Sequence, residues 1–282
     1  MSDRERVDVL LVQRGLFPSR EKARAAIMAG RVFSRGRRID KAGTPVGRDE
    51  PLEVRGEDHP FVGRGGLKLE KAFQKFPISV EGRVVLDIGA STGGFTDCLL
   101  RHGARAVYAV DVGYGQLDWR LRNDDRVIPV ERTNARYLKR ADLPGPDPDQ
   151  AVMDVSFISV RLILPVLSKL LPDGADVITL VKPQFEAGRE SVGRGGIVRD
   201  PAVHRRVLRE VMEAAGNDGF EVKGLTFSPI TGGDGNIEFL LYLRRKAEGG
   251  PPDGRWREEI PVVVEEAHRI LGQIRRKEGD RS

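Results

Sequence analysis

Residues 84–117 read VVLDIGASTGGFTDCLLRHGARAVYAVDVGYGQL, and this stretch decides the fold class of the chain. Its first residues, Val84–Ile88, are almost all apolar and predict a buried parallel strand that carries one acid, Asp87. The glycine-rich segment Gly89–Gly94 predicts a tight turn, and Phe95–His102 predicts a helix. This order of strand, turn and helix is typical of folds that bind a nucleoside cofactor over a glycine-rich turn.

A second apolar run, Ala106–Val110, predicts the next parallel strand, and the acid Asp111 follows it directly. A carboxylate at this place can accept hydrogen bonds from both hydroxyls of a ribose. The turn lacks the second glycine of the dinucleotide fingerprint, because Ser91 stands there. The segment from Asp87 to Gly94 instead resembles the loop that holds S-adenosylmethionine, a cofactor without phosphate, in class I methyltransferases.

This resemblance implies an S-adenosylmethionine site with three polar anchors. Asp87 would hold the ammonium group of the cofactor, Asp111 its ribose, and Asn134, after the predicted third strand, its adenine edge. The candidate cofactor-binding residues are Asp87, Gly89, Ala90, Ser91, Gly93, Gly94, Phe95, Asp111, Val112, Asn134 and Asp154. Each acid taken alone is also explained as a helix cap or a surface charge.

The composition is that of an ordinary globular protein, with 39% apolar and 32% charged residues among 282. The formal net charge is +5, a mild excess that permits a polyanionic partner without requiring one. Cys98 is the only cysteine, which excludes an intrachain disulfide and predicts no thiolate metal site. No signal peptide and no apolar run long enough to span a bilayer are found, so we expect a cytoplasmic protein.

The residues before position 58 predict a small domain of two helices and three short strands. Apolar spacing predicts a helix over Arg4–Arg14, and Ser19 is a good N-cap for a second helix that ends near Met28. The expected strands cover residues 31–34, 38–39 and 51–54. Clustered arginines in this region suit phosphate, because each guanidinium can form a bidentate pair, although a solvated charge run is the alternative. The candidate RNA-binding residues here are Arg20, Arg24, Arg31, Arg35, Arg37 and Arg38.

This first domain, residues 1–57, resembles the S-four-type (alpha-L) RNA-binding domain of a ribosomal protein and of several RNA-modifying enzymes. The matching features are Ser19-Arg20, Ala23, Ile27, Gly30-Arg31-Val32 and the late strand that ends at Val54. The resemblance implies that the first domain binds structured RNA. Residues 58–62 are expected to form a linker to a second domain over residues 63–282.

The second domain alternates predicted strands with predicted helices, which indicates an α/β fold with a doubly wound, mostly parallel sheet. The predicted strands are 84–87, 106–110, 127–129, 150–154, 176–181, 221–228 and 238–243. The predicted helices are 67–75, 95–102, 160–171, 201–215 and an amphipathic one over 260–276. The last two strands flank a glycine-rich turn and predict a hairpin, so one edge strand is expected to be antiparallel. This ending suits a class I (Rossmann-like) methyltransferase.

Four charged residues stand where such a sheet opens to its ligands. They are Lys68 before the first strand, Asp154 at the end of the fourth, Lys182 after the fifth and Glu238 at the start of the last. Ligands bind at the carboxyl ends of parallel strands, which is where Asp154 and Lys182 lie. The set resembles the K-D-K-E catalytic tetrad of the FtsJ-like ribose 2'-O-methyltransferases. Two ordinary salt bridges are the alternative.

A ribose 2'-hydroxyl is a weak nucleophile, so a methyltransferase must hold it and manage its proton. Lys182 is the candidate for this role, and as a base it would have to be neutral, although free lysine has a pKa of about 10.4. A second cation at Lys68 and burial would lower that pKa, whereas Asp154 and Glu238 would orient the two amines. The sequence leaves open whether Lys182 removes the proton or only steers the hydroxyl.

Motifs over nearly the whole chain resemble the TlyA (hemolysin A) family. They include GRGGLKLEKAF (63–73), DVSFIS (154–159), LVKPQFE (180–186) and SPITGGDGNIEFL (228–240). The family implies 2'-O-methylation of cytidines in ribosomal RNA of the small or large subunit, with S-adenosylmethionine and without a metal. It also implies that the RNA side includes Arg64 and the loop 186–200, with Arg189, Arg194 and Arg199.

Two other functions remain open from the sequence. A non-catalytic RNA-binding assembly factor would keep the cofactor fold as a scaffold, although all four charged positions are present. The older family label also suggests a membrane-lysing toxin, which the lack of a secretion signal and of a spanning segment disfavours.

Overall fold

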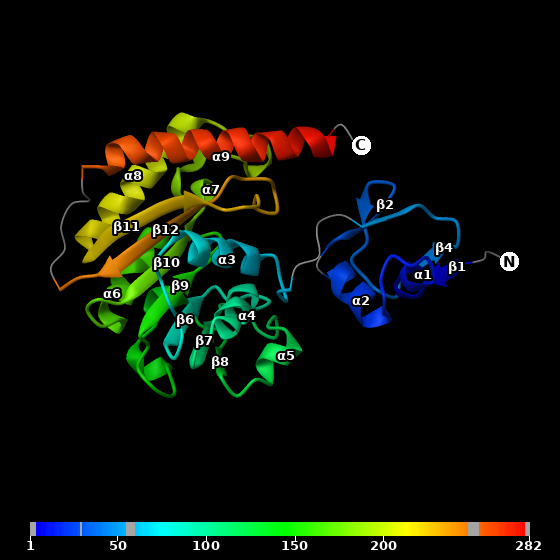
Figure 1. Cartoon of the computed structure of the whole chain (residues 1–282), viewed down its shortest axis with the longest axis horizontal. Helices are drawn as coiled ribbons and strands as arrows, with labels where there is room; N and C mark the ends of the chain where they lie inside the picture. The colour runs from blue at the N-terminus through cyan, green and yellow to red at the C-terminus, as the bar shows by residue number, and fades with distance from the viewer. Residues whose placement is uncertain (1–3, 29, 55–59, 248–253, 280–282) are drawn as a thin grey trace. The chain divides into compact units, whose positions relative to one another are not determined.

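The computed structural model describes residues 4–28, 30–54, 60–247 and 254–279, with side chains described up to residue 272 of the last helix. The chain forms two compact units, Met1–Pro60 and Phe61–Arg281 (Figure 1). Phe61 and Val62, predicted as linker, belong to the second unit. Phe61 is buried in its core, and the Val62 amide donates to Asp97 (2.9 Å). Positions 58 and 59 of the predicted linker lie outside the described residues.

In the described part of the N-terminal unit, two helices pack with short antiparallel strands. The helices are α1 (Val7–Gln13) and α2 (Arg20–Met28). The strands are β1 (Arg4–Arg6), β2 (Val32–Ser34), β3 (Arg37–Arg38), β4 (Pro45–Gly47) and β5 (Leu52–Val54). β1 pairs with β4, and β2 pairs with both β3 and β5. A small aliphatic core that includes Val7, Leu11, Ile27 and Val32 holds the unit together.

The helix predicted over Arg4–Arg14 begins three residues later than expected. Arg4–Arg6 is a strand because its backbone pairs with Pro45–Gly47, a strand that the local pattern did not indicate. The Val7 amide then donates to Thr44 O (2.9 Å), and the helix starts at this point. Pairing between distant segments has overridden a local helical preference here.

The second unit is built around a seven-stranded sheet in the order β11-β12-β10-β9-β6-β7-β8. Its strands are β6 (Val84–Ile88), β7 (Ala106–Val110), β8 (Val127–Val130), β9 (Gln150–Met153), β10 (Asp176–Val181), β11 (Phe220–Phe227) and β12 (Phe239–Arg245). The strands from β6 to β10 pair in parallel, whereas β12 is antiparallel to both of its neighbours. The predicted doubly wound, mostly parallel sheet is confirmed.

The antiparallel strand lies inside the sheet, however, and not at its edge as predicted. The hairpin of β11 and β12 is present, but β12 inserts between β10 and β11. The reason is burial: the first five residues of β12 are all buried, whereas Glu221, Lys223 and Gly224 of β11 are only partly buried, which suits the edge. Because β12 runs antiparallel to β10, its first residue, Phe239, pairs with the last residue of β10, Val181. This register brings the start of β12 to the carboxyl end of the parallel strands.

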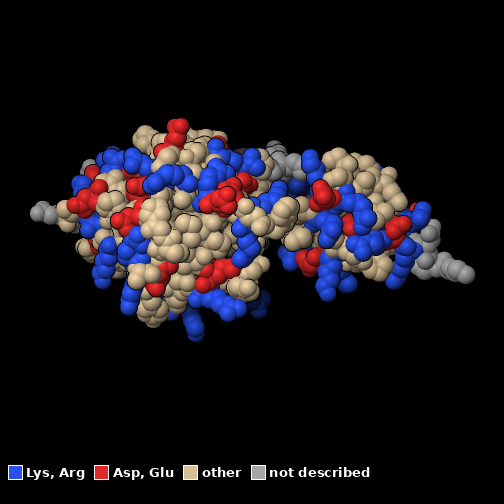
Figure 2. Space-filling model, turned by 90° about the horizontal axis from the view of Figure 1, so that it is seen from below, with Lys and Arg blue, Asp and Glu red and all other residues tan. Residues whose placement is uncertain are grey.

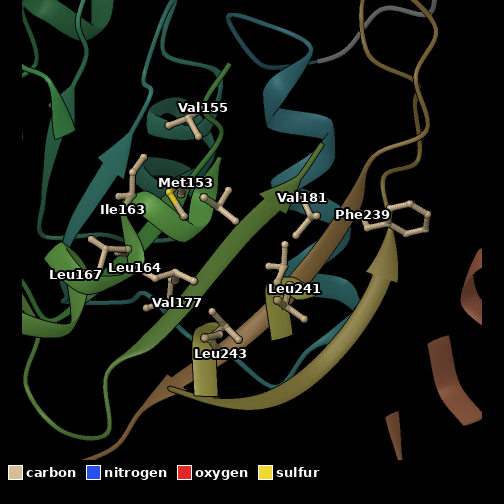
Figure 3. Packing of buried hydrophobic residues seen from close by; sticks show 14 of the residues in the cluster. Met153, Val155, Ile163, Leu164, Leu167, Val177, Val181, Phe239, Leu241 and Leu243 are labelled. Atoms are coloured by element: carbon tan, nitrogen blue, oxygen red, sulfur yellow. The ribbon is translucent and has the colours of Figure 1, made fainter. Parts of the chain in front are cut away.

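Helices cover both faces of the sheet (Figure 1). One core involves α6 (Leu164–Leu170), α8 (Pro201–Asn217) and α9 (Trp256–Gly279). The other involves α3 (Gly65–Lys75), α4 (Gly94–Arg101) and α5 (Trp119–Arg122). The strand residues alternate between these cores, so that Val177 and Val181 of β10 pack with Leu241 and Leu243 on one face (Figure 3). Such burial on both faces is the general condition of a parallel sheet.

Two short helices were not predicted, and one predicted helix is shorter than expected. The unpredicted ones are α5 and α7 (Pro183–Glu186), each a single turn after a loop at the carboxyl edge of the sheet. In place of a continuous helix over 160–171, a 3₁₀ turn at Val160–Leu162 precedes α6. Single turns are too short for a periodic pattern to reveal.

Candidate active site

The glycine-rich loop between β6 and α4 lines a pocket of about 180 Å³. Gly89 has a φ of +85°, and a Cβ there would lie 2.5 Å from the carbonyl oxygen of Asp154. Gly93 has a φ of +96°, and a Cβ there would lie 2.2 Å from Leu121. Only glycine fits at these positions, because the left-handed backbone and the close neighbours both exclude a side chain. The pocket is lined by Gly65, Gly89, Ala90, Ser91, Thr92, Gly94, Phe95, Asp154, Ser156 and Lys182.

Asp87 lies under this loop and is fully buried, so it is not part of the pocket wall. Its Oδ2 accepts a hydrogen bond from Thr96 Oγ1 (2.6 Å), and its Oδ1 has no hydrogen-bond partner among the described residues. Burial raises the pKa of this carboxyl to about 7. The loop separates this oxygen from the pocket lining, so a role of Asp87 at the ammonium end of S-adenosylmethionine stays a prediction.

The other candidate cofactor residues follow the neighbouring strands β7 and β8. Asp111 accepts hydrogen bonds from the backbone amides of Ser91 (2.8 Å) and Gly113 (2.7 Å), which fix its carboxylate beside the loop. Val112 is exposed, and Asn134 caps a 3₁₀ turn by accepting from the Arg136 amide (3.1 Å). These residues lie at the carboxyl end of the sheet, beyond the pocket lining given above.

The four candidate catalytic residues form one chain of ion pairs. Glu238 Oε2 lies 2.7 Å from Lys68 Nζ, which lies 3.4 Å from Asp154 Oδ2. Asp154 Oδ1 lies 2.6 Å from Lys182 Nζ. Lys182 Nζ also donates a hydrogen bond to Ser156 Oγ (2.9 Å). The structure therefore brings together residues that are up to 170 positions apart in the chain, from Lys68 to Glu238.

The fold explains why these side chains meet. Asp154 and Lys182 directly follow the parallel strands β9 and β10, so both lie at the carboxyl edge. Glu238 directly precedes β12, which runs the other way and so begins at that same edge. Lys68 lies on α3, which packs against α4 behind the cofactor loop. Two parallel strands, one inserted antiparallel strand and one helix are all needed to assemble the set.

Burial and pairing fix the charges at the centre of this chain. Lys68, Lys182 and Glu238 are each less than a tenth exposed. Burial disfavours the ammonium of Lys68, but Asp154 and Glu238 outweigh that effect and raise its pKa above the ordinary value. Burial likewise favours the neutral acid at Asp154, but the two lysines outweigh it and lower the pKa of Asp154. Lys68 and Asp154 thus form a stable ion pair that holds Lys182 in position.

Two neighbours of the catalytic chain were not predicted. Ser156 is the second hydrogen-bond partner of Lys182, and Phe157 is 91% exposed on a backbone with a φ of +64°. The Phe157 ring lies 5.1 Å from that of Phe185, which follows Lys182 by three residues. An exposed aromatic ring held in a strained backbone conformation near the candidate site is a candidate contact surface. The only signal in the sequence for these two residues was that they follow Asp154 by two and three positions.

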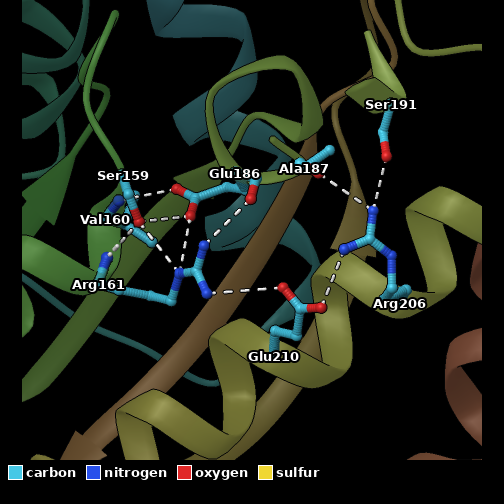
Figure 4. A network of polar contacts seen from close by, with 8 residues as sticks. All are labelled: Ser159, Val160, Arg161, Glu186, Ala187, Ser191, Arg206 and Glu210. Atoms are coloured by element: carbon cyan, nitrogen blue, oxygen red, sulfur yellow. Dashed lines mark hydrogen bonds and ion pairs between the residues drawn. The ribbon is translucent and has the colours of Figure 1, made fainter. Parts of the chain in front are cut away.

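A buried carboxylate joins the two loops that carry Asp154 and Lys182. Glu186 accepts hydrogen bonds from the Val160 amide (2.7 Å) and Ser159 Oγ (2.5 Å), and it pairs with Arg161 (Figure 4). Arg161 also donates to the Glu186 carbonyl oxygen (3.0 Å) and approaches Glu210 on α8. We call the contacts of Glu186 with residues 159–161 the Glu186 clasp. Glu186 was predicted within an RNA-facing loop, but its side chain is 5% exposed and faces the interior.

The candidate RNA-binding arginines of the N-terminal unit are largely at its surface. Arg24, Arg35, Arg37 and Arg38 are exposed, and Arg31 is partly buried. Lysine and arginine side chains are visible on the drawn face of each unit (Figure 2). The set as a whole supplies cationic groups on α2 and on the turn between β2 and β3.

Arg20 has a structural contact that was not predicted. It lies 3.1 Å from Asp8, a fully buried carboxylate that also pairs with Arg6 at 2.9 Å. The hydrogen bond from Arg6 is the main cause that lowers the pKa of Asp8 to about 2. Asp8 therefore fixes the start of α2 to the start of α1.

In the second unit, the predicted RNA-facing arginines are exposed. Arg64 donates to the Thr231 carbonyl oxygen (3.2 Å), which connects the start of α3 with the loop that leads to Glu238. Arg189, Arg194 and Arg199 are exposed in the segment between α7 and α8. Their positions leave these guanidinium groups accessible to a polyanion.

Comparisons with known proteins agree with this geometry. A model of the FtsJ-like methyltransferase family matches residues 61–245, and a model of the S4 domain matches residues 5–51. YqxC of Bacillus subtilis, provisionally named an rRNA methyltransferase, is 58% identical over 270 residues, which are 96% of each chain. The 16S/23S rRNA (cytidine-2'-O)-methyltransferase TlyA of Mycobacterium tuberculosis is 45% identical over 249 residues, which are 88% of this chain and 92% of that protein.

A solved structure gives the same assignment. A Streptococcus thermophilus protein, provisionally titled a hemolysin, matches with a TM-score of 0.77 at 49% identity and covers 98% of this chain and 100% of its own. The chain therefore belongs to the FtsJ-like methyltransferases, in the TlyA (hemolysin A) family that joins an S4 domain to the methyltransferase domain.

Proposed function

We propose that this protein methylates the ribose 2'-hydroxyl of cytidine in ribosomal RNA of the small or large subunit, with S-adenosylmethionine as donor. The observation that carries the proposal is the buried chain Glu238–Lys68–Asp154–Lys182, which opens at the pocket under the glycine-rich loop. The name of the Mycobacterium tuberculosis relative supports cytidine in 16S and 23S rRNA as the substrate. This substrate implies a cytoplasmic location.

The pocket suits S-adenosylmethionine by its chemistry. The cofactor supplies a methyl group bound to a cationic sulfur, which an oxygen nucleophile can take. The loop with Ala90, Ser91 and Gly94 would hold it, the unsatisfied carboxyl of Asp87 suits its ammonium group, and Asp111 suits its ribose. The reaction joins a developing oxyanion to a cation, so charge disappears and a pocket that excludes water favours it.

Lys182 is the residue that handles the nucleophile. Its Nζ contacts Asp154 and Ser156, and these two oxygens aim the amine toward the pocket that all three residues line. In its amine form Lys182 accepts the proton of the 2'-hydroxyl, and in its ammonium form it holds the hydroxyl oxygen. Lys68 remains charged and holds the other oxygen of Asp154, at 3.4 Å. Both carboxylates are paired with lysines, so we propose that methyl transfer itself uses no metal.

The surface around the pocket suits a nucleotide displaced from its stack. Phe157 offers an exposed ring beside the lysine, and bases that are splayed out of RNA commonly stack on aromatic side chains. Arg64, Arg189 and Arg194 supply cations for the adjoining phosphates. The S4 domain would bind the structured RNA that surrounds the target.

The test is methyl transfer to ribosomal RNA from cells that lack this gene, followed by mass-spectrometric mapping of 2'-O-methylcytidine. We expect Lys182→Ala to lower the rate by about 10²–10⁴-fold, the usual contribution of a positioned proton acceptor. Lys169→Ala is the matched control, because Lys169 is exposed on α6 and outside the site. Equal rates for the wild type and Lys182→Ala would refute the mechanism. No transfer by the wild type, with RNA binding intact, would favour the non-catalytic assembly factor.

The membrane-lysing alternative has no support from the helices that the structure describes. None of them is both long and apolar enough to cross a membrane. Leakage from liposomes at low protein concentration would revive that alternative.

A further inference from the structure

Three side chains with metal-binding atoms meet where α3 packs against α4. Glu70 comes from α3, Cys98 comes from α4, and His102 is the residue that caps the C-terminus of α4. Glu70 Oε2 lies 2.7 Å from His102 Nε2 and 3.7 Å from Cys98 Sγ, and all three ligand atoms lie within 4.8 Å of one another. In the part of the chain that the structure describes, no other group of three such residues has this geometry.

The spacing of the three atoms is close to that of a tetrahedral zinc site. Zn–S bonds of about 2.3 Å and Zn–N or Zn–O bonds of about 2.0–2.2 Å place ligand atoms roughly 3.3–3.7 Å apart. The sulfur–oxygen distance of 3.7 Å already fits, and the contact of 2.7 Å between Glu70 and His102 must open by about 0.6 Å. Cys98 and His102 are four residues apart, so they project from the same face of α4 and one turn apart.

The surroundings also suit an ion. Cys98 is fully buried, whereas the side chains of Glu70 and His102 are 30% and 37% exposed, so one side of the group is open to solvent. That side provides an entry path and a place for water as the fourth ligand. Gln74 donates to the other oxygen of Glu70 (3.3 Å), and the Phe73 ring packs on His102 (4.4 Å). Such contacts orient metal ligands in known sites.

We propose that Glu70, Cys98 and His102 bind a zinc ion that fastens α3 to α4. Without an ion, the Cys98 thiol donates to Glu70 Oε2, the oxygen that also contacts His102 Nε2, so the three side chains converge on one point. The sequence predicted no thiolate metal site because the chain has a single cysteine. The third ligand comes from a helix whose packing the sequence does not reveal.

The ion has a structural role beside the methyltransferase site. Glu70 lies two residues after Lys68 on α3, and α4 begins at Gly94 in the cofactor loop. An ion between these helices would therefore fix the backbone of Lys68 relative to the cofactor loop. It takes no part in methyl transfer, so the proposal is independent of the substrate of the enzyme.

The experiment uses the full-length chain, stripped of metal with a chelator and then titrated with Zn²⁺ against a chromophoric chelator. We expect one ion per chain and the release of about one proton as the thiol becomes a thiolate. Co²⁺ in place of Zn²⁺ should give the near-ultraviolet absorption of a thiolate–cobalt bond. Zn²⁺ should also raise the Tm of the wild type.

Variants decide whether these three residues hold the ion. Cys98→Ala and His102→Gln should each lower the zinc affinity at least tenfold, and Cys98→Ala should abolish the thiolate absorption. His268→Gln, outside the group, should change neither. The Tm without metal shows whether Cys98→Ala, at a buried position, impairs folding. His102 is partly exposed, so His102→Gln remains informative in that case. No zinc binding by the wild type, or binding unchanged in His102→Gln and Cys98→Ala, would overturn the proposal.

Discussion

Replacing Glu186 with alanine tests whether the Glu186 clasp holds the two catalytic loops. The substitution removes two hydrogen bonds to a carboxylate, from the Val160 amide and Ser159 Oγ, and leaves the buried amide without its acceptor. Hydrogen bonds to charged groups contribute about 1.5–3 kcal/mol each, so the pair amounts to about 3–6 kcal/mol. Arg161 is a third exposed, and its ion pair adds little to this sum.

We therefore expect Glu186→Ala to lower the free energy of unfolding by about 3–6 kcal/mol, and the Tm by roughly 10 °C or more for a domain of this size. Burial raises the pKa of Glu186, so the neutral Glu186→Gln, which keeps an acceptor, should lose less. The methyl-transfer rate of folded Glu186→Ala should also fall, because the loops of Asp154 and Lys182 lose their connection. The assays are denaturant and thermal unfolding, together with methyl transfer well below the Tm.

Glu190→Ala is the matched control for this prediction, because Glu190 is an exposed carboxylate in the same segment. It should leave stability and rate near those of the wild type. A loss below about 1 kcal/mol in Glu186→Ala, no larger than a typical surface substitution, would show that the clasp does not hold the loops.

Three further outcomes are expected from the cofactor and substrate sides of the pocket. The raised pKa of Asp87 means that the folded state holds a proton that the unfolded state releases, so wild-type stability should fall by up to about 4 kcal/mol as the pH rises from 4 to 7. Asp87→Asn should lack this dependence in denaturant unfolding, and an equal slope in both proteins would contradict the assignment. Gly89→Ala should weaken S-adenosylmethionine binding at least tenfold by calorimetry, because its Cβ meets Asp154 O at 2.5 Å; unchanged affinity would count against the loop. Phe157→Ala should raise the KM for RNA and leave S-adenosylmethionine affinity unchanged, and an unaltered KM would remove the stacking role.

Much of the second unit could be predicted because its strands are buried on both faces. β7 and β10 match the predicted bounds, and the other strands differ by one or two residues at their ends. The place of β12 could not be predicted, because a hairpin pattern fixes which strands are neighbours but not which one joins the sheet. The start of α1 was missed for a related reason, since β1 depends on a partner forty residues away.

The candidate site likewise contains residues that could be placed from the sequence and contacts that could not. Asp154 and Lys182 could be placed from the sequence, because each directly follows an apolar strand whose end is the ligand edge. The Glu186 clasp and the contact of Arg20 with Asp8 could not, because each depends on packing between elements far apart in the chain. Asp87 illustrates a third case: its position near the end of the first predicted strand was clear, but its complete burial under the loop was not.

The place of β12 between β10 and β11 also determines when the newly made protein can complete its sheet. Lys68, Asp154 and Lys182 emerge from the ribosome well before Glu238, and β11 emerges before the strand that must join it to the rest. A nascent chain therefore carries most of the charged set with an unfinished sheet edge. The charged set is therefore complete only after translation has delivered the final hairpin and it has docked.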